Sequence, residues 1–313
     1  MRIALTGATG FAGKLILSEL KIAKHEIKTL ARQPERLDQT QAEIIKGDLS
    51  DAAALALLVA NAEVVVHVAG AISAHNRAGY FATNLNGTKK LYEAARQAKA
   101  ERFVFVSSIS AREPKLSHYA ASKAAAEHFL LGQTSGPKVL ILRPSAIYGP
   151  GDKATLPLLK ALQSHFAILP GRASARFSLI HVEDFARVVA DAAFSDASGI
   201  FEVDDLGGGH TWADLAKINR DITGQPQKQI HAPKPLAHTV AAFAELFGAV
   251  WGKPSMTNRG KVAELYHSDW VVRGANWPRD NPIGLAEGYA DTLRWYIQEG
   301  WLPAKSQIVR KRV

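Results

Sequence analysis

Short apolar runs alternate with longer amphipathic stretches through the first half of the chain. Six runs have the length and the β-branched and aromatic content of strands: 2–6, 26–31, 43–45, 63–69, 102–107 and 138–143. Several are apolar on both faces, as is typical of strands buried within a parallel sheet. Helices are expected between them, over 11–22, 51–60, 77–98 and 117–132. This alternation predicts an α/β fold with a Rossmann-type, doubly wound parallel sheet.

The pattern changes after Gly149-Pro150-Gly151, where strand-like runs become rare and helical patterns dominate. We therefore expect a dinucleotide-binding domain over residues 1–160 and a smaller, mostly helical substrate-binding lobe over 161–313. Two short runs, 177–181 and 200–203, are predicted to return to the main sheet, so that the chain rejoins the first domain over about 177–204. The apolar face of segment 236–251 suits a lid, a membrane-surface helix or, more commonly, core packing.

A glycine-rich turn follows the first strand and opens the first expected helix, in the sequence Thr6-Gly7-Ala8-Thr9-Gly10-Phe11-Ala12-Gly13. The first glycine permits a tight turn, the second lets backbone N–H groups approach a pyrophosphate, and the third lets helix pack on strand. An ordinary glycine-rich connection is the alternative. Because strand and helix flank the turn, we predict that it binds a dinucleotide through Gly7, Thr9, Gly10, Phe11, Ala12 and Gly13.

The end of the second strand bears on which cofactor binds. Enzymes that use NAD usually place an acidic residue there to hold the ribose hydroxyls. This chain has Arg32 instead, whose guanidinium suits a 2′-phosphate, so NADP is expected rather than NAD. The alternative is a solvated surface arginine. Contacts with adenine and ribose are expected from the residues after the third and fourth strands, namely Asp48, Leu49, Val68, Ala69 and Gly70.

Tyr119 and Lys123 lie four residues apart in an expected helix, so their side chains share a face. A phenol has an ordinary pKa of about 10, so a tyrosine that exchanges protons near neutrality needs a nearby cation, and we expect Lys123 to lower the pKa of Tyr119. Ser107 and Ser108 end the fifth strand, at the sheet edge where doubly wound folds bind ligands. Ser108 is expected to hold the substrate oxygen while Tyr119 transfers its proton.

In their order and spacing these motifs resemble the extended, epimerase/dehydratase-like branch of the short-chain dehydrogenase/reductase superfamily. The resemblance covers nearly the whole chain. It rests on TGATGFAG at 6–13, GDL at 47–49, VVHVAG at 65–70, TNLNGTKKL at 83–91, FVFVSS at 103–108, YAASK at 119–123, LRPSAIYGPGD at 142–152 and HVEDFA at 181–186.

The resemblance implies residue roles beyond those argued above. It makes Ser108, Tyr119 and Lys123 catalytic, with Lys123 also holding the nicotinamide ribose. It implies a supporting role for Asn84, places Ser107 with the cofactor-binding residues, and sets Pro144 and Ser145 beside the nicotinamide. It also implies a homodimer formed through the helices at 77–98 and 117–132.

The combined prediction is an NAD(P)-dependent oxidoreductase that moves hydride between nicotinamide and a carbonyl or carbinol carbon of a small molecule. One alternative is a nucleotide-sugar epimerase or dehydratase that retains its cofactor, although only eleven positions separate Ser108 from Tyr119, shorter than in those relatives. Another is a non-catalytic NADP(H)-binding regulator or complex subunit. Arg172 and Arg176 are candidate contacts for acidic substrate groups, or else solvated arginines.

Composition narrows the class of protein further. The 38 Lys and Arg exceed the 29 Asp and Glu, but apart from Arg310, Lys311 and Arg312 they are scattered, so nucleic-acid binding is not expected. The chain has no cysteine, and its 11 histidines lack paired ligand spacing, so no metal site is expected. No run reaches the about 18 uninterrupted apolar residues of a membrane span, since the nearest, 236–251, contains His238 and Glu245. The start does not resemble a secretory signal. We therefore expect a cytoplasmic enzyme.

Overall fold

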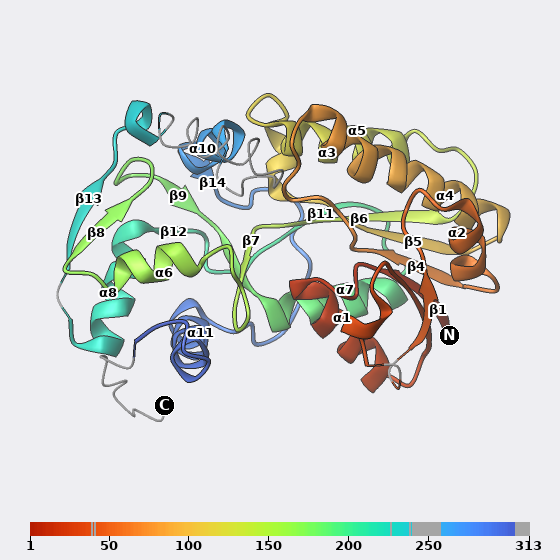
Figure 1. Ribbon diagram of the computed structural model, residues 1–313, viewed down its shortest axis with the longest axis horizontal. Helices are drawn as coiled ribbons and strands as arrows, with labels where there is room; N and C mark the ends of the chain where they lie inside the picture. Colours follow the sequence, from red (N-terminus) through yellow and green to blue (C-terminus); the bar gives the residue numbers. More distant parts are fainter. Residues whose placement is uncertain (39, 41, 226, 238, 240–257, 304–313) are drawn as a thin grey trace.

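The computed structural model describes residues 1–38, 40, 42–225, 227–237, 239 and 258–303 (Figure 1). A seven-stranded sheet forms its larger part, in the order β11-β6-β5-β4-β1-β2-β3, and every pairing is parallel. The strands are β1 (Arg2–Thr6), β2 (Glu26–Ala31), β3 (Glu43–Lys46), β4 (Val64–His67), β5 (Arg102–Val106), β6 (Lys138–Pro144) and β11 (Gly199–Val203). The predicted α/β class and doubly wound sheet are confirmed.

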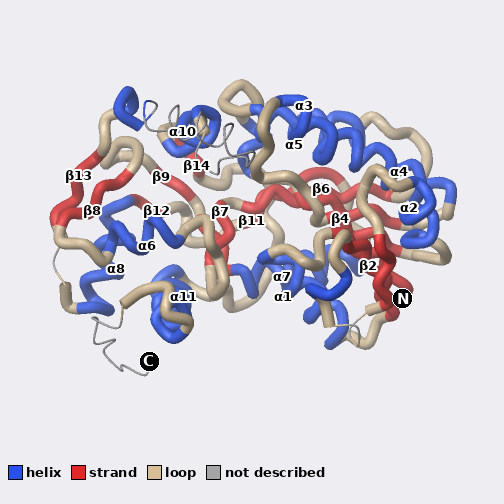
Figure 2. Tube along the Cα trace, viewed as in Figure 1, coloured by secondary structure: helices blue, strands red, loops and turns tan. Residues whose placement is uncertain are grey.

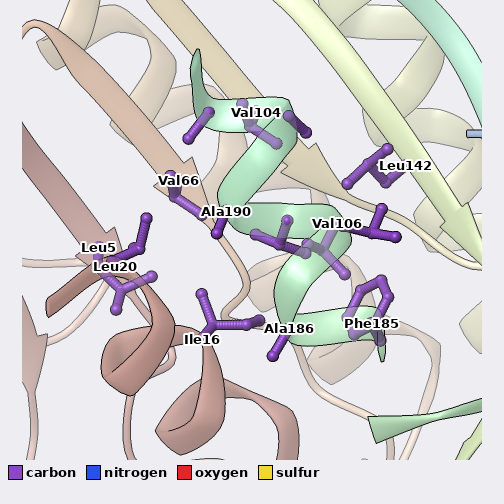
Figure 3. Packing of buried hydrophobic residues seen from close by; sticks show 14 of the residues in the cluster. Leu5, Ile16, Leu20, Val66, Val104, Val106, Leu142, Phe185, Ala186 and Ala190 are labelled. Carbon is purple, nitrogen blue, oxygen red and sulfur yellow. The ribbon is translucent and has the colours of Figure 1, made fainter. Parts of the chain in front are cut away.

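Helices cover both faces of this sheet. Helices α1 (Phe11–Ile22) and α7 (Val182–Phe194) pack on one face, and α2 (Ala52–Val59), α4 (Thr88–Gln97) and α5 (His118–Leu131) pack on the other. Alternate strand residues point to opposite faces, which explains why the strands are apolar throughout. Figure 3 shows the first face, where Ile16 and Phe185 meet Val106 and its neighbours. Truncating a leucine in such a core costs about 2–5 kcal/mol.

The single helix predicted over 77–98 is interrupted. It consists of α3 (Arg77–Phe81), a π-helical turn η2 (Ala82–Gly87) and then α4. A π-turn carries an extra residue relative to an α-helix and redirects the side chains on it, and such turns are frequent at functional sites. Here the redirected side chain is Asn84, which is buried.

A smaller second lobe lies at the other end of the molecule and contains both helices and short strands (Figure 2). Its own apolar core includes Tyr148, Leu169, Trp212, Tyr289 and Leu293. Its elements are β7 (Ala146–Tyr148), α6 (Leu156–Leu162), β8 (Phe166–Leu169), β9 (Arg176–Phe177), β10 (Leu179–His181), β12 (His210–Thr211), α8 (Trp212–Thr223), β13 (Lys228–His231), α10 (Arg259–Leu265), β14 (Asp269–Trp270) and α11 (Leu285–Gln298).

Part of the predicted return to the main sheet is wrong. Residues 177–181 divide between β9, which pairs with β12 and β14, and β10, which pairs with β7. Between them Ser178 is buried, donates a hydrogen bond to Asp204 at 2.7 Å and accepts one from the Val272 N–H, so the chain turns there instead of continuing a ladder. Only β11 joins the main sheet, at its edge beside β6.

Two predictions concern membranes. Of segment 236–251, only residues 236, 237 and 239 are among the described residues, so its suggested role as lid, surface helix or core lies outside what the structure describes. Within the described part of the chain, no helix is long and apolar enough to span a bilayer.

Candidate active site

The glycine-rich turn lies at the point where the sheet order reverses, between β1 and β4. Gly7 has φ of +86°, and a Cβ there would lie 2.7 Å from the Ala69 nitrogen. A Cβ on Gly13 would lie 1.9 Å from the Gly7 carbonyl oxygen. Gly10 precedes α1 without a capping side chain, and the first turn of α1 carries no acidic residue. This cradle therefore suits an anion such as a pyrophosphate, which the helix N-terminus favours.

A chain of buried hydrogen bonds runs from this turn toward α4. The Thr6 hydroxyl lies 2.7 Å from His67 Nδ1, and His67 Nε2 lies 2.9 Å from the Thr88 hydroxyl. Thr88 in turn donates to the Asn84 carbonyl oxygen at 2.7 Å. Burial, assisted by the charge of Lys123, lowers the pKa of His67 to about 3. His67 is therefore a neutral structural link over the physiological range.

The side chain of Asn84 joins three elements. Its Oδ1 accepts from the Ala71 N–H at 2.7 Å, and its Nδ2 donates to the Ala71 carbonyl at 3.1 Å and to the Ser122 hydroxyl at 2.9 Å. A Cβ on Gly70 would lie 3.2 Å from Asn84 Oδ1 and 3.5 Å from Lys123 Nζ. The loop after β4, the π-turn and α5 thus meet at the Asn84 side chain, and its supporting role toward a cofactor stays a prediction.

Lys123 is buried at the carboxyl end of β5. Its ammonium donates to the Val106 carbonyl at 2.7 Å and lies 4.5 Å from the centre of the Phe105 ring. Burial lowers the pKa of Lys123 to about 8, and the charge of Glu127 opposes that shift. The cation is therefore held in place by β5 and stays protonated at neutral pH.

Tyr119 and Ser108 lie together at the same edge of the sheet. The Ser108 oxygen caps η3 (Ile109–Arg112) by accepting from the Ser110 N–H at 3.2 Å. Burial raises the pKa of Tyr119 to about 12; a hydrogen bond with Ser108 lowers it, and the charges of Glu264 and Tyr80 raise it. Lys123 is not among the causes of this shift, and the lowering of the Tyr119 pKa expected from it stays a prediction. Burial therefore favours the neutral form of the Tyr119 phenol.

An ion pair that the sequence analysis did not single out supports this edge. Glu127, buried one turn beyond Lys123, receives the Ser107 hydroxyl at 2.5 Å and two guanidinium nitrogens of Arg143, with Nη2 at 2.5 Å and Nε at 2.9 Å. Arg143 Nη1 lies 3.8 Å from Glu202 of β11. The hydroxyl proton of Ser107 is therefore directed to Glu127. The four-residue spacing of Tyr119, Lys123 and Glu127 is a sequence signal that would have placed Glu127 on the same helix face.

The second lobe contributes contacts that no sequence pattern indicated. The Ser117 hydroxyl, which caps α5, also donates a hydrogen bond to the buried carboxylate of Glu264 on α10. Asn258, which caps α10, donates to the Tyr80 hydroxyl at 3.3 Å, and the Tyr80 ring centre is 6.3 Å from that of Tyr119. Helix α10 therefore closes against the start of α5, where Tyr119 lies.

The other predicted cofactor residues lie at neighbouring strand ends. Arg32 is exposed after β2, and its charge helps to lower the pKa of Asp48, although the main cause is hydrogen bonding from Ser50. Leu49 packs against Gly87, where a Cβ would lie 2.8 Å from the leucine. Pro144 and Ser145 are buried at the end of β6, and the Ser145 hydroxyl has no hydrogen-bond partner. A buried hydroxyl of this kind suits a polar ligand.

The two predicted substrate contacts lie in the second lobe. Arg172 and Arg176 are exposed, and Arg176 donates to the Gly208 carbonyl at 2.8 Å. They lie outside the cluster of contacts around Tyr119 and Lys123 described above. Over the described residues, no three His, Asp or Glu side chains are grouped in a way that would hold a metal ion.

The cradle at Gly7 and Gly13, the uncapped start of α1 and the unpartnered Ser145 hydroxyl all fit a nicotinamide dinucleotide. The sequence model of the NAD dependent epimerase/dehydratase family matches residues 3–203. The chain belongs to this family. It is an enzyme, an NAD(P)-dependent oxidoreductase of the extended short-chain dehydrogenase/reductase type, and not a non-catalytic binding protein.

Relatives of known name extend over the whole chain. A ceramide reductase from Caulobacter vibrioides (strain NA1000 / CB15N) is 37% identical over 309 residues, covering 96% of each chain. A UDP-glucose 4-epimerase from Vibrio cholerae is 26% identical, covering 95% of each. The crystal structure of the Thermus thermophilus UDP-glucose 4-epimerase in complex with NAD has a TM-score of 0.70 at 24% identity, covering 95% of this chain and 99% of that one. That similarity shows a shared fold.

Proposed function

We propose that this enzyme is an NADPH-dependent reductase that converts a ketone of a ceramide-like lipid to an alcohol. The observation that carries this proposal is the grouping of Ser108, Tyr119 and the buried ammonium of Lys123 at the carboxyl end of β5. A phenol that retains its proton is the form that donates to a carbonyl oxygen. The similarity to the Caulobacter vibrioides ceramide reductase over nearly the full length of both chains supports the substrate class.

The residues act on the carbonyl group in a defined order. Ser108 and Tyr119 hold the carbonyl oxygen with their hydroxyl groups and polarise it. When bound, NADPH would supply the hydride that the carbonyl carbon accepts. As the C=O π bond breaks, the Tyr119 hydroxyl gives its proton to the oxygen, which forms the alcohol. The ammonium of Lys123, one helical turn from Tyr119, stabilises the phenolate that remains.

Two finer points belong to the same proposal. Arg32 is exposed beyond β2, at the position where an acidic residue would hold the ribose of NAD. It selects NADP by pairing with the 2′-phosphate of that cofactor. A homodimer forms through the helices at 77–98 and 117–132, that is, through α3, η2 and α4 together with α5. On α5, Ala121, Ala124 and Ala125 are partly exposed and suit close helix packing, whereas Ala120 is fully buried and belongs to the interior.

Steady-state oxidation of NADPH with a long-chain keto-amide lipid tests the function. Tyr119→Phe is expected to lower kcat by a factor of about 10²–10⁴ while NADPH affinity changes less than about twofold. Tyr266→Phe is the matched control, since Tyr266 is partly buried in the second lobe and its hydroxyl bonds the Ala232 carbonyl.

Two results would refute the proposal. Full turnover by Tyr119→Phe would show that the Tyr119 hydroxyl is not the proton donor. Cofactor that co-purifies tightly and shows no net oxidation with any ketone, together with epimerisation of a nucleotide sugar, would instead establish the retained-cofactor mechanism.

A further inference from the structure

A small two-stranded sheet forms the outer end of the second lobe (Figure 1). Strands β8 and β13 pair in parallel, with Phe166 opposite Lys228 and Ile168 opposite Ile230. On the inner face, Ala167 and Leu169 are fully buried in the core of the lobe. On the outer face, Phe166, Ile168 and Ile230 are 54%, 63% and 47% exposed. The sheet therefore presents a row of large apolar side chains to solvent, which we call the β8–β13 face.

Large exposed side chains that gather on one face indicate an interaction surface, whereas scattered ones are ordinary. The two strands of the β8–β13 face also form a small sheet of their own. In the described residues, each of its two strands pairs only with the other. Leu236, a few residues beyond β13, is a further apolar side chain that is 58% exposed.

The segments that form this face carry basic side chains and no acidic ones. Residues 153–182 and 222–237 contain no aspartate or glutamate, although a chain with 29 acidic residues among 313 would place about four in stretches of that length. The same stretches contain exposed basic side chains, and Lys160, Lys228 and Lys234 are among them. His165 is exposed next to Phe166, with the two ring centres 4.8 Å apart. The segments that carry the apolar row thus also supply exposed lysines and a histidine.

We propose that the β8–β13 face docks on the surface of an anionic lipid bilayer. Aromatic and aliphatic side chains enter the boundary between headgroups and acyl chains, and lysines around them attract anionic headgroups. A second copy of this chain is a poorer occupant, because two faces of the same positive charge repel each other. A nucleic acid would pair with the lysines but would leave Phe166 and Ile168 unused.

This proposal goes beyond the proposed reaction and does not depend on it. Docking by a few side chains at the bilayer surface requires no membrane-spanning segment. If the substrate is a lipid, the face would hold the enzyme where that substrate is concentrated. The tests of the two proposals are separate, since vesicle binding is measured without turnover and NADPH oxidation with the keto-amide lipid is measured without vesicles.

Flotation with vesicles made of equal parts phosphatidylglycerol and phosphatidylcholine tests the docking face. The native protein is expected to float with these vesicles, less at high salt, and not with phosphatidylcholine alone. The double variant Phe166→Ser, Ile168→Ser is expected to bind at least about tenfold more weakly. Its matched control is Ile22→Ser, Leu57→Ser, which removes side chains that are 71% and 58% exposed on α1 and α2. The control is expected to bind within about twofold of the native protein.

A double variant of two lysines tests the electrostatic part of the proposal. Lys160→Glu with Lys228→Glu is expected to abolish the preference for phosphatidylglycerol, whereas Lys21→Glu on α1, also an exposed lysine, leaves it unchanged. The proposal is overturned if the native protein does not float, or if the Phe166, Ile168 variant floats as the native protein does. It is also overturned if that variant converts a dimer to a monomer in light scattering, since the face would then join two copies.

Discussion

The ammonium nitrogen of Lys123 donates a hydrogen bond to the carbonyl oxygen of Val106, 2.7 Å away. The bond ties α5 to the last residue of β5, beside the loop at Gly70. It holds a positive charge at the carboxyl edge of the sheet. Lys123 is 3% exposed, so keeping its ammonium charged costs free energy, and this cost depends on pH.

The cost predicts how stability changes with pH. The pKa of Lys123 is about 8 in the folded protein, against 10.5 for an ordinary lysine. Below pH 8 both states are protonated and the folded state bears the full penalty. The penalty disappears as the pH rises from about 8 to 10.5, because the folded protein releases the proton first. The free energy of unfolding is therefore expected to rise over this range, by up to about 3 kcal/mol.

Chemical denaturation at several pH values, compared between the native protein and Lys123→Met, isolates this contribution. The difference between the two is expected to change over pH 8 to 10.5 and to be flat below pH 7. Lys21→Met, which removes an exposed lysine, is expected to show a flat difference throughout. A flat difference for Lys123→Met as well would mean that the lysine is not desolvated.

Gly13 is predicted to tolerate no side chain. A Cβ there would lie 1.9 Å from the Gly7 carbonyl oxygen, a backbone atom that cannot move without opening the turn. Gly13→Ala is expected to lower the free energy of unfolding by about 1–3 kcal/mol and to abolish NADPH binding, measured by melting and by fluorescence titration. Gly284→Ala is the control, because a Cβ built on Gly284 would meet no other group within 4 Å. Equal behaviour of the two variants would contradict the assignment of the cradle.

Arg32 is predicted to set the cofactor preference. Arg32→Gln removes the guanidinium expected to pair with the 2′-phosphate, so the Kd for NADPH should rise about 10–100-fold while that for NADH changes less than about twofold. Isothermal titration with both cofactors measures this. Arg96→Gln removes an arginine on α4 that pairs with Glu93, and is expected to alter neither Kd. Equal losses for NADPH and NADH would show that Arg32 does not read the phosphate.

Glu264 is predicted to keep Tyr119 protonated. Its carboxylate accepts from Ser117 at the start of α5, and its charge raises the pKa of Tyr119 together with Tyr80. In Glu264→Gln the hydrogen bond to Ser117 is retained and the charge is lost, so the phenolate is less disfavoured. The alkaline limb of the pH profile for ketone reduction should then move to lower pH, by about half a unit or more. Glu101→Gln, an exposed site, should leave the profile unchanged, and an unmoved limb in Glu264→Gln would exclude this role.

Local spacing was enough to predict much of the dinucleotide-binding half. The parallel strands were recognisable because both of their faces are buried, which removes polar residues from consecutive positions such as Val64, Val65 and Val66. The positions of the glycines in the first turn and of Tyr119 and Lys123 follow from backbone geometry over a few residues. Such features are properties of a short segment, and they do not depend on what lies across the molecule.

The sequence by itself thus determined the sheet, the glycine turn and the helix that carries Tyr119 and Lys123. Only the tertiary structure decided that Tyr119 has a raised pKa, that Glu264 of α10 reaches Ser117, and that residues 177–181 leave the main sheet. Each of these depends on burial or on a partner far away in the chain. Burial removes water from a group whatever its sequence neighbours are, and a contact between residues 147 positions apart leaves no periodic pattern in either segment.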